Sequence, residues 1–73
     1  MIRIDPFSFG AAVRARRRAM RLSQDAVADA IGVNRRVIGE LERGKATVRL
    51  EIALAAANAV GLDIEMTART IAL

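Results

Sequence analysis

The chain of 73 residues contains no cysteine and no histidine, and Phe7 and Phe9 are its only aromatic residues. These absences exclude disulfides, thiolate zinc sites, histidine metal ligands and Ser-His-Asp triads. The carboxylates of the chain have basic neighbours, and no glycine-rich phosphate loop is present. We therefore expect no metal, no cofactor and no enzymatic activity.

Long apolar stretches are also missing from the sequence. No uninterrupted apolar run approaches ~18 residues, and residues 1–9 lack the basic start and apolar core of a signal peptide. We therefore expect a cytoplasmic protein. Residues 1–73 suffice for a single domain with a small core, and a domain of that size gains stability by burying surface against a second subunit.

The charge of the chain is mostly carried by arginine. Basic residues outnumber acidic residues by 12 to 8, and every basic residue except Lys45 is an arginine. Arginine binds phosphates and guanine edges through paired hydrogen bonds, which favours a polyanionic partner. A net charge of +4 can also serve solubility alone, so the positions of the arginines must decide between these interpretations.

Residues 23–45 have the pattern of two short helices that meet at a tight turn. Ser23 suits the N-cap of the first helix, Gly32 suits the left-handed residue that ends it, and Asn34 suits the N-cap of the second. Apolar residues recur at helical spacing on one side of each helix, namely Val27, Ala28, Ala30, Ile31, Val37, Ile38 and Leu41. The segment therefore predicts a helix-turn-helix.

This motif resembles the XRE-type helix-turn-helix, the class of Cro, phage repressors and HipB-like antitoxins. The residues that carry the resemblance are Gln24, Ala28, Gly32, Ile38 and Leu41, followed by Glu42, Gly44 and Lys45. The resemblance implies a mainly α, lambda-repressor-like helix-turn-helix domain of four to five helices. The alternative is a plain helical hairpin in a different all-α domain.

The resemblance also implies DNA contacts for the polar residues of the motif. Arginine can pair with guanine N7 and O6, and glutamate can accept from cytosine N4. Contacts to base edges would come from Asn34, Arg35, Arg36 and Glu40. Contacts to phosphates would come from Gln24, Arg43 and Lys45. Arg36 is the best candidate for direct base contact, whereas Asn34 can equally serve only as a helix cap.

A structural ion pair between Arg17 and Glu42 is a further implication of the resemblance, and it would lock the first helix of the domain onto the second helix of the motif. We expect the neighbouring arginines to face solvent, with one of them at most reaching a phosphate: Arg14, Arg16, Arg18 and Arg21. Gly39 lies within a predicted helix, where glycine is unfavourable. Its missing side chain would let the helix approach the groove, unless it reflects only drift at an exposed position.

The segment before the motif predicts an extended start followed by a helix. Within residues 1–5, Ile2 and Ile4 alternate with Arg3 and Asp5 ahead of Pro6, which fits a short strand or an extended arm. Ser8 can cap a helix over about residues 9–21. The inward positions of that helix would be Phe9, Ala12, Val13 and Met20.

The segment after the motif, residues 50–70, predicts a helix and then a strand that serve dimerisation. Residues 50–60 form a helix that is apolar on nearly all sides and ends at Gly61. From Leu62 apolar and polar residues alternate, which is typical of a strand, and its partner would be residues 1–5, its own copy in a second subunit, or both. HipB-like proteins end in a strand that pairs across a two-fold axis. The expected dimer contacts are Ile52, Val60, Leu62, Ile64 and Met66.

The expected function is sequence-specific binding of double-stranded DNA by a homodimer that represses transcription at a pseudo-palindromic operator. The resemblance favours the antitoxin of a toxin–antitoxin pair, with the toxin as a partner protein. A phage Cro-like repressor or a controller of a restriction-modification system would have the same features. A different class of function is a protein-interaction module that neutralises a toxin and binds DNA with little specificity.

Overall fold

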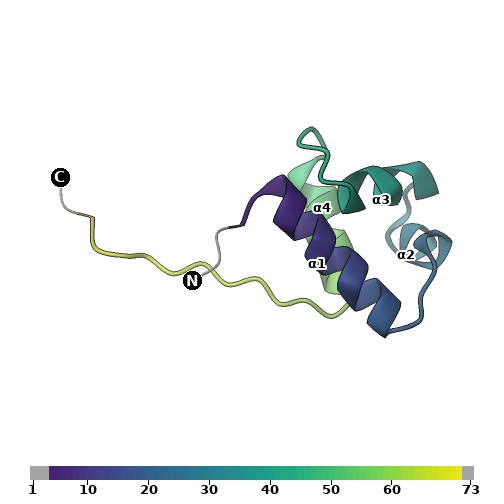
Figure 1. Cartoon of the computed structure of the whole chain (residues 1–73), viewed down its shortest axis with the longest axis horizontal. Coiled ribbons are helices and arrows are strands. Elements are labelled where there is room, and N and C mark those ends of the chain that lie inside the picture. The colour runs from purple at the N-terminus through teal and green to yellow at the C-terminus, as the bar shows by residue number, and fades with distance from the viewer. Residues whose placement is uncertain (1–3, 72–73) are drawn as a thin grey trace.

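The computed structural model describes residues 4–71 of the chain, and this part contains four helices (Figure 1). They are α1 (Pro6–Ala19), α2 (Gln24–Ile31), α3 (Arg35–Glu42) and α4 (Leu50–Ala59). Figure 1 shows α2 and α3 to one side of α1, α4 behind α1, and an extended segment that leaves the helices after α4. The prediction of a mainly α fold is confirmed. None of these helices has the length and apolar character needed to cross a bilayer.

Helix α1 begins at Pro6 and not near Phe9, because Asp5 is its N-cap and Ser8 is not. The Asp5 carboxylate accepts a 2.7 Å hydrogen bond from the backbone N–H of Ser8, and the Ser8 hydroxyl accepts a 3.0 Å hydrogen bond from the backbone N–H of Asp5. Pro6 fits the first helical position, where a missing N–H costs nothing. The hydrogen bond from the Ser8 N–H also lowers the pKa of Asp5.

The inward side of α1 also differs from the predicted one. Val13 is fully buried and Gly10 is buried, whereas Ala12 is exposed. Met20 follows the last helical residue and is 42% exposed. Phe9 is half-buried and packs against the core, as predicted. The inward positions are therefore Phe9, Gly10, Val13 and Arg17, at the spacing of three and four residues that one face of a helix requires.

The caps and the turn between α2 and α3 are formed as predicted. The hydroxyl of Ser23 accepts a 3.0 Å hydrogen bond from the backbone N–H of Ala26. Gly32 ends α2 with a φ of 73°, a left-handed conformation in which a side chain would be strained. Asn34 then caps α3. The helix-turn-helix prediction is confirmed.

The core lies where the four helices meet, and its largest fully buried side chains are Val13, Val27, Ile38 and Val60. Small residues bring the helices close together: Ala28 of α2 and Ala56 and Ala57 of α4 are buried where these two helices pack. Gly10 has the same effect between α1 and α3, because a Cβ atom there would collide with the carbonyl oxygen of Leu41. Helix α3 is thus packed against α1 and α2, which leaves its opposite side at the surface.

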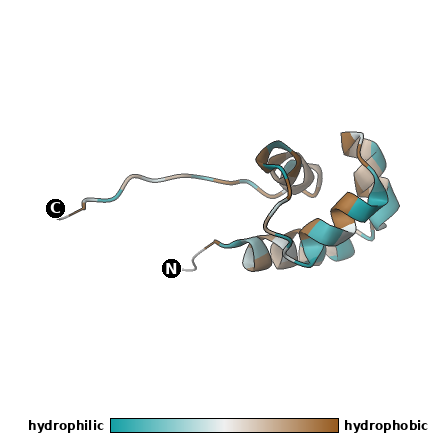
Figure 2. Ribbon diagram, turned by 90° about the horizontal axis from the view of Figure 1, so that it is seen from above, coloured by the Kyte–Doolittle hydropathy of each residue, from teal (hydrophilic) through white to brown (hydrophobic). Residues whose placement is uncertain are grey.

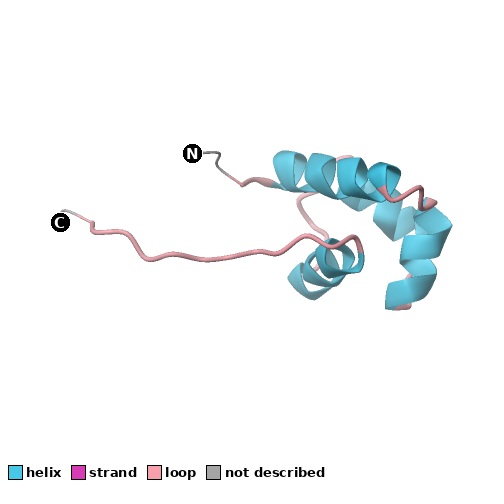
Figure 3. Ribbon diagram, turned by 90° about the horizontal axis from the view of Figure 1, so that it is seen from below, coloured by secondary structure: helices cyan, strands magenta, loops and turns pink. Residues whose placement is uncertain are grey.

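The predicted C-terminal strand is not formed within residues 4–71 (Figure 3). Residues 62–71 are an extended segment along which hydrophilic and hydrophobic residues alternate (Figure 2). A strand needs backbone partners on a neighbouring strand, and the described part of this single chain supplies none. Pairing across a dimer therefore stays a prediction. Of the predicted N-terminal strand, residues 1–3 lie outside the described residues, and Ile4 and Asp5 lead into α1 without forming a strand.

The residues that we expected at the dimer interface differ in how exposed their side chains are. Val60 is fully buried in the core of its own chain, so its side chain has no surface to offer a partner. The reason is that Val60 continues the inward stripe of α4. Ile52 and Leu62 are half-buried, whereas Ile64 is 50% and Met66 96% exposed.

Candidate nucleic-acid interface

The first turn of α3 presents three of the residues that we expected to contact bases. Asn34 precedes the helix, and its side-chain oxygen accepts a 2.8 Å hydrogen bond from the backbone N–H of Arg36. Its role as a cap is therefore shown, and a base contact by Asn34 stays a prediction. Arg35 and Arg36 follow, with side chains 66% and 81% exposed. Both guanidinium groups lie at the surface, where a groove of DNA can reach them.

Glu40 lies one turn further along α3 and binds two cations. Its Oε1 atom accepts a 3.1 Å hydrogen bond from Arg36 Nε, and its Oε2 atom accepts a 3.2 Å hydrogen bond from Lys45 Nζ. The hydrogen bonds from Arg36 and Lys45 hold the pKa of Glu40 below its usual range. Lys45 is also fixed by its backbone N–H, which donates to the Glu40 carbonyl at 3.0 Å. A base contact by Glu40 would compete with these contacts inside the chain.

Glu42, at the end of α3, connects α3 to α1 and α2. Its carboxylate accepts hydrogen bonds from Arg17 Nε at 2.6 Å, from Arg17 Nη2 at 2.9 Å and from Gln24 Nε2 at 3.2 Å. Arg17 Nη1 donates to the Leu22 carbonyl at 2.8 Å, in the turn before α2. The exposed fraction is 2% for the Glu42 side chain and 11% for that of Arg17. These contacts fix how α1, α2 and α3 are oriented relative to one another.

The electrostatics of this pair follow from its burial and its hydrogen bonds. Burial acts to raise the pKa of Glu42, but the hydrogen bonds from Arg17 and Gln24 outweigh it, so the pKa lies below its usual range. The hydrogen bond to Glu42 raises the pKa of Arg17. Both pKa shifts therefore favour the charged forms, in which the two groups form the ion pair.

Gly39 makes room for two residues that we expected to bind phosphates. A Cβ atom at Gly39 would lie 3.2 Å from Arg43 Nη1 and 3.7 Å from Gln24 Oε1. The side chains of Arg43 and Gln24 thus lie over α3 in the space that a side chain at position 39 would otherwise occupy. The hollow at this place has a volume of about 410 Å³ and is also lined by Asn34, Arg35 and Arg36. The structure therefore brings five of the seven expected DNA-contacting residues together on one surface. The other two, Glu40 and Lys45, line a separate hollow.

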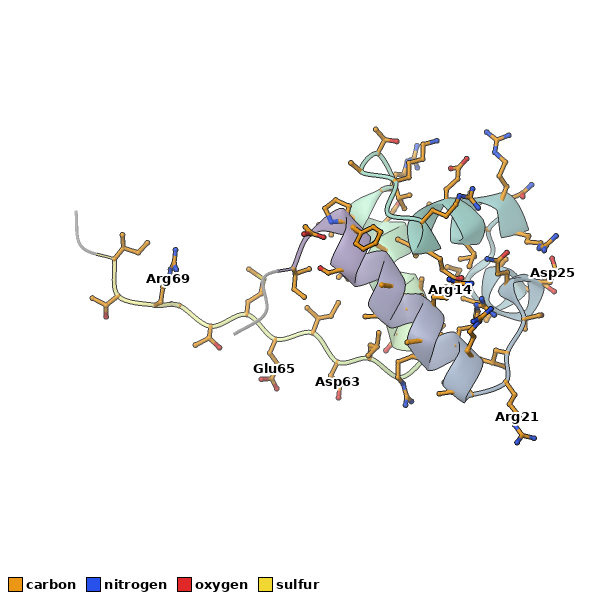
Figure 4. All side chains as sticks on the ribbon, in the orientation of Figure 1. Arg14, Arg21, Asp25, Asp63, Glu65 and Arg69 are labelled. Atoms are coloured by element: carbon orange, nitrogen blue, oxygen red, sulfur yellow. The ribbon has the colours of Figure 1, made fainter. Side chains whose placement is uncertain are left out.

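Two arginines of α1 that we expected to face solvent have specific neighbours. Arg14 extends from α1 towards the side of α2 and α3 (Figure 4), where it lines a second hollow of about 320 Å³ with Gln24, Gly39 and Arg43. It adds a positive charge beside the phosphate-binding candidates. The signal for this role is its spacing of three residues from Arg17, which places both on one face of α1. Arg16 Nε instead donates to the Val60 carbonyl at 3.1 Å, which satisfies a carbonyl at the end of α4.

Comparison with known proteins shows which family has this arrangement of helices. A family model described as helix-turn-helix matches residues 13–66, which is more than half of the chain. None of the curated proteins with which the chain was compared matches it. The matched region begins within α1 and includes α2, α3 and α4, so it contains every residue of the surface described above. The chain belongs to the XRE-type helix-turn-helix family of DNA-binding transcription regulators.

Proposed function

We propose that the protein is a homodimeric, sequence-specific transcriptional repressor that inserts α3 into the major groove of a pseudo-palindromic operator. The observation that carries the proposal is the outer surface of α3, where the exposed Arg35 and Arg36 share a hollow with Gln24 and Arg43. An α-helix fits the major groove, and the N-terminal residues of a recognition helix contact base edges. The opposite side of α3 is buried in the core, so the helix is presented in one orientation.

In this proposal, one set of residues contacts the bases and another set contacts the phosphates. Arg36 pairs with a guanine through two hydrogen bonds, with Arg35 and Asn34 at neighbouring positions. Gln24 binds a phosphate together with the N–H groups at the start of α2, and Arg43 and Lys45 bind the backbone at the other end of α3. Phosphate contacts set the position of the protein on the duplex, and base contacts set the preferred sequence.

Dimerisation through the C-terminal part of the chain is the second element of the proposal. Ile64 and Met66 are exposed on the extended segment, and Leu50 and Leu54 are 72% and 43% exposed on α4. Exposed apolar side chains and unpaired strand backbone both favour association. Two copies that pair residues 62–69 in antiparallel fashion would cover these groups. Their α3 helices would then enter successive major grooves, ~34 Å apart.

The regulatory role that we propose is autoregulation by the antitoxin of a toxin–antitoxin pair, in the cytoplasm. One observation favours a second candidate function, a module that neutralises a toxin without specific DNA binding. The extended segment, residues 62–71, is exposed except at Leu62 and can add as a strand to another protein. A repressor shows a steep salt dependence and a defined footprint, whereas the module binds DNA weakly and without sequence preference. The reading frame beside this one would identify a toxin partner.

Alanine substitutions at Arg36 and Lys45 test the division between base and phosphate contacts. Duplexes that bind the wild type are first selected from a random pool. Arg36→Ala should cost about 1–3 kcal/mol on a selected duplex and relax the preference at one base pair per half-site. Lys45→Ala should weaken binding to every duplex alike and reduce the salt slope by about one.

Arg69→Ala is the charge-matched control, because Arg69 projects from the extended segment far from α3 (Figure 4). It should leave the base preference unchanged. If Arg36→Ala and Lys45→Ala lower affinity equally for selected and random duplexes, the assignment of Arg36 to base contact is wrong. If the wild type itself selects no preferred sequence, the proposed repressor function is wrong and the protein-interaction module remains.

A further inference from the structure

Glu40 has surroundings that a carboxylate devoted to base contact would not need. Each of its two oxygens accepts one charged hydrogen bond, from Arg36 Nε on one side and from Lys45 Nζ on the other. Its side chain is 19% exposed, whereas those of Arg36 and Lys45 are 81% and 49% exposed. The carboxylate is thus less accessible to an approaching DNA duplex than either of the cations that it binds.

The hydrogen bond to Arg36 leaves the other side of the guanidinium group available. Arginine has five N–H donors in a fixed planar arrangement, and Glu40 uses the one on Nε. The outer N–H groups on Nη1 and Nη2 can still form the paired contact to guanine O6 and N7. Glu40 can therefore remain bound to Arg36 while Arg36 contacts a base, and this arrangement fixes the direction in which Arg36 points.

Contact with phosphates requires a different direction of the Arg36 guanidinium group. Where Arg36 turns from a base edge to a phosphate on either side of the groove, it gives up the hydrogen bond from its Nε atom to Glu40. The carboxylate is then left close to the phosphates with one cation fewer, which is electrostatically unfavourable. Binding to random DNA, which rests on phosphate contacts, therefore loses more from the presence of Glu40 than binding to an operator does.

We propose that Glu40 is a specificity-determining positioning residue, which holds Arg36 in the direction of a base edge and withholds it from non-specific phosphate contacts. This role replaces the direct cytosine contact expected from the sequence. It rests on the proposed function, because it assumes that Arg36 contacts a base of an operator. It adds that a residue without contact to DNA lowers the affinity for the wrong sequences.

The test compares Glu40→Gln with Glu65→Gln, an equal change of charge on the extended segment (Figure 4). Affinity is measured for a random-sequence duplex and for a duplex selected by the wild type, each across a range of salt concentrations. Glu40→Gln should bind the random duplex about 3–10-fold more tightly, with a salt slope steeper by about one, because one more cation reaches the phosphates. The ratio of selected to random affinity should fall about tenfold. Glu65→Gln should leave the ratio and the salt slope unchanged.

A second substitution and a second background separate this role from a general loss of structure. Glu40→Ala removes the same contacts by another change, so both variants should shift the ratio in the same direction while their thermal unfolding stays cooperative. In an Arg36→Ala background, Glu40→Gln should no longer lower the ratio, since no arginine remains to be positioned. A ratio that still falls tenfold in that background would overturn the proposal.

Two other results would also overturn it. If Glu40→Gln weakens binding to the selected duplex and leaves the random duplex unaffected, Glu40 contacts a base itself. If Glu65→Gln produces the same gain on random DNA, the effect is one of net charge. The proposed function fails separately, when the wild type shows no difference between selected and random duplexes.

Discussion

Glu42 is a buried carboxylate whose partners, Arg17 and Gln24, come from two other helices. Two ions removed from water lose hydration, and their attraction repays this loss only when the hydrogen bonds are good. Here the pair has two hydrogen bonds between guanidinium and carboxylate, and no buried side-chain nitrogen or oxygen in the described residues lacks a partner. The main consequence of such a pair is a fixed geometry, which places Gln24 beside α3.

Removal of one partner of this pair should cost more than removal of both. Arg17→Met leaves the carboxylate of Glu42 buried without its cation, while the hydrogen bond from Gln24 remains. We therefore expect a loss of about 3 kcal/mol in the free energy of unfolding. The double variant Arg17→Met/Glu42→Leu buries no charge and should regain most of that loss. Urea unfolding followed by circular dichroism measures both values.

Arg18→Met is the control for the arginine substitution, because Arg18 is exposed on the same helix. It should change the free energy of unfolding by less than about 0.5 kcal/mol. A double variant that is less stable than Arg17→Met would contradict this account, since the pair would then contribute net stability and not only geometry.

Two glycines lie within helices, and their surroundings differ. At Gly10 of α1 an added Cβ atom would meet the carbonyl oxygens of Leu41 and Glu42, which belong to a backbone that cannot move without shifting α3. At Gly39 of α3 the nearest atom is the end of the Arg43 side chain, at 3.2 Å, and that side chain can move. Gly10 therefore sets the distance between two helices, whereas Gly39 sets only the space above one of them.

The same substitution at these two positions should have opposite effects on stability. Gly10→Ala should lower the free energy of unfolding by about 2 kcal/mol or more, because overpacking outweighs the gain in helix propensity. Gly39→Ala should raise it by up to about 1 kcal/mol, the difference in propensity between the two residues. Thermal and urea unfolding of the two variants measure the effects side by side. Equal and favourable effects at both positions would show that α1 does not touch α3 at Gly10.

Local signals made some elements predictable from sequence and left others ambiguous. Both ends of α2 and the start of α3 follow from Ser23, Gly32 and Asn34, each of which acts within its own turn. The start of α1 was mispredicted because Asp5 and Ser8 are both good caps, and the pair forms one capping box in which the first residue is the cap. The inward role of Gly10 depends on the backbone of α3, and no local pattern contains that information.

The whole molecule has two parts with different exposure. The four helices enclose the core, and the segment that follows α4 runs away from them, exposed from residue 63 to residue 71 (Figure 1). Leu62 belongs to the first part, because its backbone N–H donates to the Ala57 carbonyl at 2.9 Å and its side chain packs on the core. A chain that ends after Asp63 therefore retains the helices and loses the predicted strand.

This truncation tests whether the segment forms the dimer. The truncated chain should unfold cooperatively, sediment as a monomer at micromolar concentration and lose specific DNA affinity although α3 is intact. In the full chain, Ile64→Asp/Met66→Asp should have the same effect. Glu65→Lys changes the charge on the opposite side of the strand and should leave the dimer unchanged. A wild-type monomer, or a truncated chain that still dimerises, would contradict the predicted pairing.

Features that depend on several elements at once were the least predictable from sequence. The alternation after Leu62 indicates a strand, but a strand forms only with a partner, and the sequence does not state which partner. The position of Arg14 beside the phosphate-binding candidates and the binding of two cations by Glu40 depend on how α1 and the residues after α3 pack. Motif spacing predicted the DNA-facing residues, and the packing shows which of these residues bind one another, as Glu40 binds Arg36 and Lys45.

We propose that a two-fold dimer places its two α3 helices in successive major grooves of one operator. Hydroxyl-radical footprinting of the wild-type protein on a selected duplex tests this claim most directly. We predict two protected half-sites, related by a dyad and with centres ~34 Å or about ten base pairs apart. One protected patch without dyad symmetry, or half-sites at a spacing that does not match whole turns of the duplex, would contradict the account.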